Sequence, residues 1–478
     1  MKFDDDWFTY RRSRLLDAVT HYPDGELRCA HLARGILANS RLYGEIDAVT
    51  AGALRHLAPR HRGAVRAHMQ FYRNALEVFG FLPSDAIVNA AVQVEWLWYV
   101  TPFKPFYRDH LAHVMKVAVI ALDLLDQPNS PFADNGRPLL DRLGVALASP
   151  KANAPHLRIA ARRAGIPEED LVKPELWRAA VLETTRLASL LHDMAYPDVM
   201  AVKVEGAARP VRPRAPFEPG VRDTCRNAVD SFQHHLLAAP FYRGKIPGAG
   251  GIEERDRDIA AAVFEHSHSL RAGYSLLRIL DDARRIGALT PFDVFVIEWA
   301  ALAMSLHDYD KFFSEKHTSE EMRRWLYKDN NWPNICPAFE TDPVSFLVAF
   351  ADQIQDFGRM AYEVSDEAGD DDAATVRARY PVNAVEVERE EGGVLSLTFE
   401  LGSGTKKSFA PKDARMIADI AGDKHRSPAF AGSMRPGGTD ALPPWLMPGN
   451  LYSEVRLRVR HEGQDYGADG NPVHATVP

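Results

Sequence analysis

Histidine and aspartate residues stand beside apolar stretches in five widely separated segments of the chain. The segments are YRDHLAHVMKVAVIAL (107–122), LASLLHDMAYP (187–197), FEHSHSLRAGYSLLRIL (264–280), WAALAMSLHDYDK (299–311) and FLVAFADQIQDFGR (346–359). Imidazole nitrogens and carboxylate oxygens bind divalent transition metals, which need several such ligands at about 2 Å. Helices hold ligands rigidly, and ligands from separate helices can meet in the core of a bundle. The pattern therefore predicts a metal centre inside a helical domain.

Taken together, these segments resemble the HD superfamily of metal-dependent phosphohydrolases. Its signature is a histidine on a helix, a His-Asp doublet that closes a later helix, and a distant aspartate. Its bimetallic branches add two histidines between the doublet and that aspartate. The resemblance implies the six-residue ligand set of HD-GYP-type phosphodiesterases and HD-fold diiron oxygenases: His113, His192, Asp193, His268, His307 and Asp352. It also implies one or two divalent transition-metal ions (Mn, Fe or similar) as the cofactor.

Two features leave alternatives open. His266 could be a ligand in place of His268, because residues two apart on a helix point in different directions. Many HD enzymes continue the doublet as HDxGK, but this chain has HDMAYP, with Tyr196 in place of the lysine. A second doublet does have that lysine, Lys311. It defines an alternative ligand set that leaves His113 and His192 outside: His268, His307, Asp308 and Asp352.

The resemblance further implies a phosphohydrolase that acts on a nucleotide or another phosphate ester through a water activated by the metal. The residues expected to take part in catalysis are Asp193, His268, Asp109 and Lys311. Asp109 and His110 lie one turn before the first ligand histidine and could orient ligands. Arginine binds phosphate bidentately, so a basic loop is expected to bind the substrate through Lys203, Arg209, Arg212 and Arg214. Tyr196, which follows the doublet, is also expected to bind substrate. A solvated surface loop is the alternative for the basic segment.

Two other functions fit the same residues. An HD-fold mixed-valence diiron oxygenase would use the same six ligands, and dioxygen consumption would separate it from a hydrolase. A non-catalytic HD module would act as a sensor or as one component of an assembly. Such a module would be expected to lose ligands, whereas this chain retains all six.

The elements that position these residues are predicted to be mainly helical. Apolar residues recur at three- and four-residue spacing over 64–79 and 84–100. Near the C-terminus, two alternating segments flank Gly392 and Gly393, which is typical of a hairpin. The expected organisation is an N-terminal helical region (1–102), an HD-type helical bundle (103–365), an acidic linker (366–374) and a small α+β region (375–478). The last region is expected to contain strands at 384–390, 394–401 and 451–459 and a short helix at 412–420.

Composition limits the class of protein. The chain has 478 residues, 46% hydrophobic and 26% charged, with a formal net charge of −8. This charge does not favour nucleic acid or an anionic membrane as a partner. The three cysteines form no close pair, the start MKFDDDWFTYRR lacks the features of a signal peptide, and charges interrupt every long apolar run. We therefore expect a cytoplasmic protein with a phosphorylated small-molecule substrate, no membrane partner and an N-terminal region suited to homo-oligomer contacts.

Overall fold

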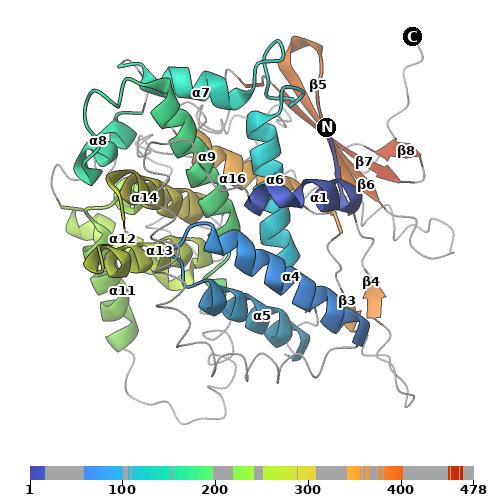
Figure 1. Cartoon of the computed structure of the whole chain (residues 1–478). Coiled ribbons are helices and arrows are strands. Elements are labelled where there is room, and N and C mark those ends of the chain that lie inside the picture. Colours follow the sequence, from blue (N-terminus) through green and yellow to red (C-terminus); the bar gives the residue numbers. More distant parts are fainter. Residues whose placement is uncertain are drawn as a thin grey trace.

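The fold is mainly helical, with a small sheet formed largely by the C-terminal part of the chain (Figure 1). This confirms the coarse fold class predicted from the sequence. The computed structural model describes residues 1–16, 59–100, 106–107, 110–150, 152, 154–196, 219–241, 251–287, 289–307, 342–355, 357–358, 362–364, 376–378, 382–401, 451–452, 454–461 and 463–466. None of the helices within these ranges is long and apolar enough to span a lipid bilayer.

The N-terminal part begins with a strand and then becomes helical. Its elements are β1 (Lys2–Asp4), α1 (Asp5–Arg11), the 3-10 helix η1 (Arg12–Leu16), α4 (Pro59–Glu77) and α5 (Ser84–Val100). The two helices predicted from periodicity correspond to α4 and α5. Helix α1 is capped by Asp4, whose side chain accepts a hydrogen bond from the Trp7 backbone amide at 2.7 Å. The strand β1 was not predicted.

The central part of the chain is a packed set of helices. They are α6 (His110–Asp126), α7 (Leu139–Ala148), α8 (Pro155–Ala164), α9 (Pro174–Leu191), α11 (Pro219–Phe232), η3 (Leu236–Phe241), α12 (Glu254–His266), α13 (His268–Arg285), α14 (Pro291–Leu306) and α16 (Pro343–Ile354). Several begin with proline, which suits the first helical turn because its missing N–H has no intrahelical partner there. Helix α14 also has a capping box, in which Thr290 and Asp293 bind each other's backbone amides.

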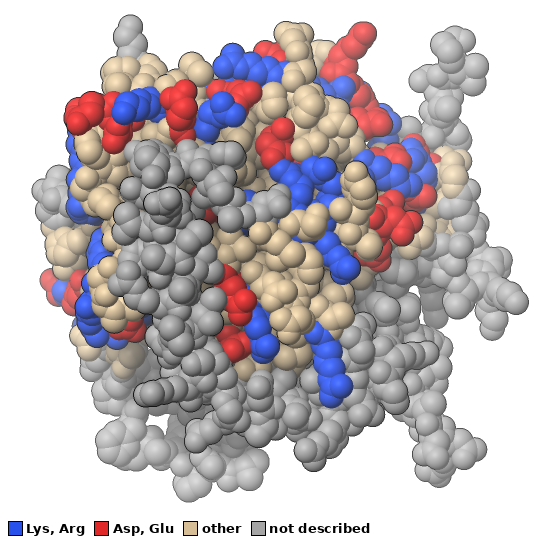
Figure 2. All heavy atoms as spheres, in the orientation of Figure 1, with Lys and Arg blue, Asp and Glu red and all other residues tan. Residues whose placement is uncertain are grey.

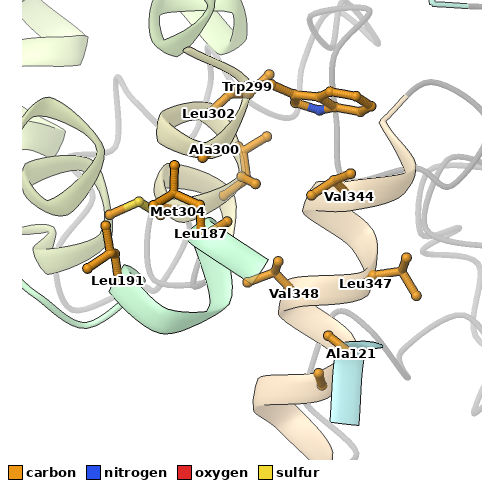
Figure 3. Close-up of a cluster of buried hydrophobic side chains, with 14 of the residues drawn as sticks. Ala121, Leu187, Leu191, Trp299, Ala300, Leu302, Met304, Val344, Leu347 and Val348 are labelled. Carbon is orange, nitrogen blue, oxygen red and sulfur yellow. The ribbon is translucent and has the colours of Figure 1, made fainter. Parts of the chain in front are cut away.

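An apolar core joins the four helices α6, α9, α14 and α16. Figure 3 shows part of it, with Leu187 and Leu191 of α9 facing side chains of α14 and α16. Trp299 and Val344, on α14 and α16, are fully buried in the same cluster. On the other side of α14, α13 packs closely at Gly273, where an added Cβ would lie 2.4 Å from the Ala301 carbonyl oxygen. These contacts fix the helix ends relative to one another.

The C-terminal sheet has five strands in the described residues, in the order β1-β5-β6-β7-β8. The others are β5 (Val382–Arg389), β6 (Val394–Leu401), β7 (Glu454–His461) and β8 (Gln464–Tyr466). The predicted hairpin is confirmed: β5 and β6 are antiparallel and joined through η5 (Glu391–Gly393). The predicted third strand corresponds to β7, which pairs in parallel with β6. The predicted linker and the helix at 412–420 lie outside the described residues.

A second, smaller sheet connects the helical part with the segment that follows α16. It contains β2 (Phe106–Tyr107), β3 (Tyr362–Val364) and β4 (Val376–Ala378), all antiparallel to their neighbours. In the sequence, β2 precedes the central helices α6–α16, and β3 and β4 follow them.

The first 16 residues link the C-terminal sheet to the helices. Strand β1 pairs with β5, and Lys2 lies opposite Glu386, so the N-terminus lies at the sheet (Figure 1). Trp7 and Arg11 both donate hydrogen bonds to the buried carboxylate of Asp123 on α6. The predicted division at 102 and 365 stays a prediction, but these contacts place residues 1–16 against both later parts of the chain.

Candidate metal centre

The ends of five helices bring together the six residues of the implied ligand set. His113 lies in the first turns of α6, and Asp352 in the last turn of α16. His192 and His307 come directly after α9 and α14, in a corresponding position on each helix. His268 is the first residue of α13, and Asp193 follows His192 in the turn after α9. The predicted doublet at the end of an apolar helix is therefore present.

One half of the cluster lies around Asp352. Its Oδ1 atom is 3.0 Å from His113 Nε2 and 3.6 Å from His192 Nε2. The two imidazole Nε2 atoms are 3.3 Å apart. Asp193 Oδ2 lies 3.6 Å and 3.5 Å from the same two nitrogens.

The other half lies around the second oxygen of Asp193. Its Oδ1 atom is 3.3 Å from His268 Nε2 and 3.6 Å from His307 Nε2. These two nitrogens are 3.2 Å apart. Asp193 thus stands between the halves and presents one carboxylate oxygen to each.

This donor set fits divalent transition metals. Atoms bound to one ion at about 2.1 Å and separated by about 90–110° lie about 3.0–3.4 Å from one another, and the distances above range from 3.0 to 3.6 Å. Two overlapping groups have ligand atoms close enough to hold an ion: His113, His192 and Asp352, and His192, Asp193 and His307. The predicted buried metal-binding cluster is therefore present, while the number and identity of ions belong to the proposal below.

The far side of two imidazole rings is occupied by a backbone carbonyl oxygen. His192 Nδ1 lies 2.8 Å from the Ser189 carbonyl oxygen, and His307 Nδ1 lies 2.6 Å from that of Met304. A carbonyl oxygen can only accept, so Nδ1 carries a hydrogen in each ring. Each Nε2 lone pair is then directed into the cluster, as a metal ligand requires.

His113 is oriented by a residue that the sequence analysis did not identify. Its Nδ1 atom is 2.5 Å from Oε1 of Gln355, a fully buried side chain just after α16. Glutamine has no distinctive signal in a sequence. The available clue was its place in the apolar-flanked segment AFADQIQDF, three residues after Asp352.

The cluster attracts positive charge. Burial by itself lowers the pKa of His192, but the charge of Asp193 and the hydrogen bond and charge of Asp352 outweigh it and raise that pKa to about 9. Burial by itself raises the pKa of both carboxyls, and the surrounding histidines bring each pKa well below its ordinary value. A metal ion supplies positive charge in place of these protons, since binding to imidazole displaces them.

A pocket opens beside Asp193. It is a small, partly open pocket with a cavity volume of about 20 Å³, and it is lined mostly by apolar and aromatic side chains: Tyr72, Ile87, Ala91, His110, Val114, Asp193, Met194 and Tyr196. Helices α4 and α5 of the N-terminal region supply one wall. The Tyr196 ring centroid lies 4.3 Å from that of His268 and 4.9 Å from that of His110. Tyr196, predicted to bind substrate, therefore lies at this pocket.

Most of the other predicted site residues lie outside the described part of the chain. The catalytic and substrate-binding predictions for Asp109, Lys203, Arg209, Arg212, Arg214 and Lys311 fall outside the described residues. So do Asp308, which the alternative ligand set needs, and the side chain of His266. His113 and His192, which that alternative leaves out, lie in the same cluster as Asp352.

No protein-family model, curated protein or solved structure matches this chain.

Proposed function

We propose that the protein is an HD-type metal-dependent phosphohydrolase that cleaves a phosphate ester, such as a nucleotide, with water as the nucleophile. The observation that supports this most directly is the position of Asp193. Its two oxygens face separate groups of imidazoles, 3.3–3.6 Å away. A carboxylate shared in this way suits two ions held side by side, an arrangement used to cleave phosphate esters.

The six side chains divide between two ion positions. His113, His192 and Asp352 would hold one ion, His268 and His307 the other, and Asp193 both. When bound, such ions neutralise phosphoryl oxygens and lower the pKa of a coordinated water to near neutrality. The chain's part is to hold the ligands rigidly at helix ends and to surround them with apolar side chains.

Two residues at the pocket suit direct roles toward the substrate. His110 is buried, lines the pocket, and has Nδ1 3.6 Å from Asp193 Oδ2. An imidazole there can give a proton to the oxygen that leaves phosphorus. Tyr196 offers a ring face and a hydroxyl at the same opening, and Ile87 and Met194 help to exclude water.

The apolar lining of the pocket favours a second candidate, the diiron oxygenase. Among the described lining residues there is no lysine or arginine to bind a phosphate, and such a lining would suit an uncharged substrate. An oxygenase would bind iron and consume dioxygen, whereas the hydrolase releases inorganic phosphate.

The test begins with the metal content of the purified protein. Phosphate release is then measured over a set of nucleotides and simple phosphate esters with Mn²⁺ or Fe²⁺, alongside dioxygen consumption. We expect phosphate release by the wild-type protein, and loss of both metal and turnover in Asp193→Ala with helical content preserved. Asp134→Ala, in the turn between α6 and α7, is the matched control and should behave like wild type. Full turnover by Asp193→Ala would refute the proposed function, and dioxygen consumption without phosphate release would favour the oxygenase.

A further inference from the structure

The side-chain amide of Gln355 joins the candidate metal cluster to the backbone at Phe357. Oε1 lies 2.5 Å from His113 Nδ1, and Nε2 donates to the Phe357 carbonyl oxygen at 3.0 Å. The side chain is fully buried, so water cannot replace either partner cheaply. The amide therefore has a fixed orientation, with its oxygen toward the histidine.

The Phe357 carbonyl also accepts from a buried lysine. Lys116, on the same helix as His113, donates to this oxygen at 3.2 Å and to Asp5 Oδ1 at 2.6 Å. Its side chain is 5% exposed, whereas that of Asp5 is 64% exposed. The Lys116 ammonium also lies over the rings of Phe8 and Phe357, at 5.8 Å and 5.0 Å from their centroids. A buried ammonium needs such compensation, and Asp5 supplies the negative charge.

Gly358 closes the turn tightly against this pair. Its φ of +63° is unfavourable for residues with a side chain. A Cβ added there would lie 2.3 Å from Asp5 Oδ1 and 2.6 Å from Lys116 Nζ. The backbone of residues 357–358 is thus held in direct contact with α1 at the N-terminus.

We propose that Gln355, Lys116 and Asp5 are positioning residues for the metal centre, joined in one chain of hydrogen bonds that ends at His113. Asp5 neutralises Lys116, Lys116 holds the Phe357 carbonyl, and that carbonyl fixes the amide of Gln355. Gln355 then holds the His113 ring with its Nε2 toward Asp352. The N-terminal helix is in this way part of the metal site, although it contributes no ligand. This inference rests on the proposed metal function of the six-residue cluster.

The first test replaces Gln355. In Gln355→Leu, His113 loses its acceptor, and we expect Mn²⁺ affinity to fall about 10- to 100-fold, as is usual when the partner of a ligand histidine is removed. Gln355→Glu keeps an oxygen for His113 but cannot donate to Phe357. Its Mn²⁺ affinity should stay near wild type or rise, because a carboxylate makes the imidazole a stronger ligand. Affinity is measured by competition with a chromophoric chelator on metal-free protein.

The second test compares neighbouring aspartates on α1. Asp5→Asn removes the charge that compensates Lys116, while Asp6→Asn changes an adjacent exposed residue without a described contact to this chain of bonds. We expect Asp5→Asn to weaken Mn²⁺ binding by roughly 3- to 10-fold, below the loss at Gln355, and Asp6→Asn to have wild-type affinity. In a Gln355→Leu background, Asp5→Asn should cause no further loss, because linked positions are not additive.

The outcomes separate this inference from the proposed function. If wild-type protein binds no Mn²⁺, Fe²⁺ or Zn²⁺, the metal centre is refuted and the positioning role falls with it. If wild type binds metal and Gln355→Leu binds it equally well, only the positioning role of Gln355 is refuted. Additive losses for Asp5→Asn and Gln355→Leu would show that Asp5 acts by another route and would overturn the chain of bonds.

Discussion

His192 and His307 make the same kind of hydrogen bond at the ends of two different helices. Each ring donates from Nδ1 to the carbonyl oxygen three residues earlier, a group that the end of a helix leaves without an intrahelical partner. The helix end gains a partner and the ring gains a fixed direction. The family resemblance implied a set of histidines that the structure brings together, although the sequence left open the choice between His266 and His268 and a second ligand set. The sequence could not predict Gln355, because a glutamine that orients a ligand and one on the surface look alike in sequence.

The two halves of the cluster lead to a prediction about stoichiometry. We expect two metal ions per wild-type chain and about one in His307→Ala, because His113, His192 and Asp352 remain near one another. Elemental analysis of protein loaded with Mn²⁺ and then desalted measures the ratio. His234→Ala, an exposed histidine, is the control and should retain two. An unchanged ratio in His307→Ala would contradict a ligand role for this residue.

The buried residue His156 makes the free energy of unfolding depend on pH. His156 is 4% exposed, and burial lowers its pKa to about 4, against about 6.5 in an unfolded chain. The unfolded state therefore takes up a proton first as pH falls. The stabilising contribution is complete above about pH 6.5 and is lost progressively toward pH 4, by up to about 1.4 kcal/mol per pH unit.

His156→Leu removes this titration. We expect the urea midpoint of the variant to fall less steeply than that of wild type between pH 6.5 and pH 5, as followed by circular dichroism. Other titrating groups are common to both proteins, so they cancel in the comparison. Parallel curves would show that His156 does not carry this dependence.

At the scale of elements, strong local patterns were predicted well and short or non-local ones were not. Helix α5 and strand β6 have the predicted bounds because each carries a continuous apolar pattern. Strand β1 has three residues, too few to show alternation, and its partner lies at the other end of the sequence. The parallel pairing of β6 with β7 could not be predicted either, because strand direction depends on the path of the connection between them.

Helix α16, which carries Asp352, depends on the buried residue before it. Asp342 caps the helix through the Ser345 backbone amide at 3.2 Å and accepts from the Trp299 indole at 2.8 Å. Asp342→Ala removes the cap and leaves the indole N–H without its acceptor. We expect a loss of about 2–4 kcal/mol in the free energy of unfolding.

Asp342→Asn is the matched comparison, because its side-chain oxygen can still cap the helix. It should lose less stability than Asp342→Ala in urea denaturation. Equal losses would show that the negative charge, and not the hydrogen bonds, carries the effect.

At the scale of the molecule, the cluster ties together helices from across the central region. Ions bound there would stabilise only the folded state, in which the ligands from α6, α9, α13, α14 and α16 are gathered. On the face shown in Figure 2, described basic and acidic side chains lie interspersed. The buried cluster differs from this surface because its charged and ionisable groups are histidines and aspartates, with no lysine or arginine among its six residues.

Metal removal should consequently lower thermal stability. Free metal at about 100 times its dissociation constant adds about 2.7 kcal/mol to folding, so we expect metal-free protein to melt several degrees below the Mn²⁺-loaded form in scanning calorimetry. Asp193→Ala should show no such difference. A melting temperature independent of Mn²⁺ in wild type would contradict a site that joins these helices.

The pairing of β1 with β5 has a consequence for biosynthesis. Residue 2 is synthesised long before its partner, residue 386, because 384 positions separate them in the sequence. At roughly 5–20 residues per second, the interval is about 20–80 s. During that time Phe3, fully buried in the finished protein, has no sheet to join. The edge that it occupies is thus among the last parts of the protein to be assembled.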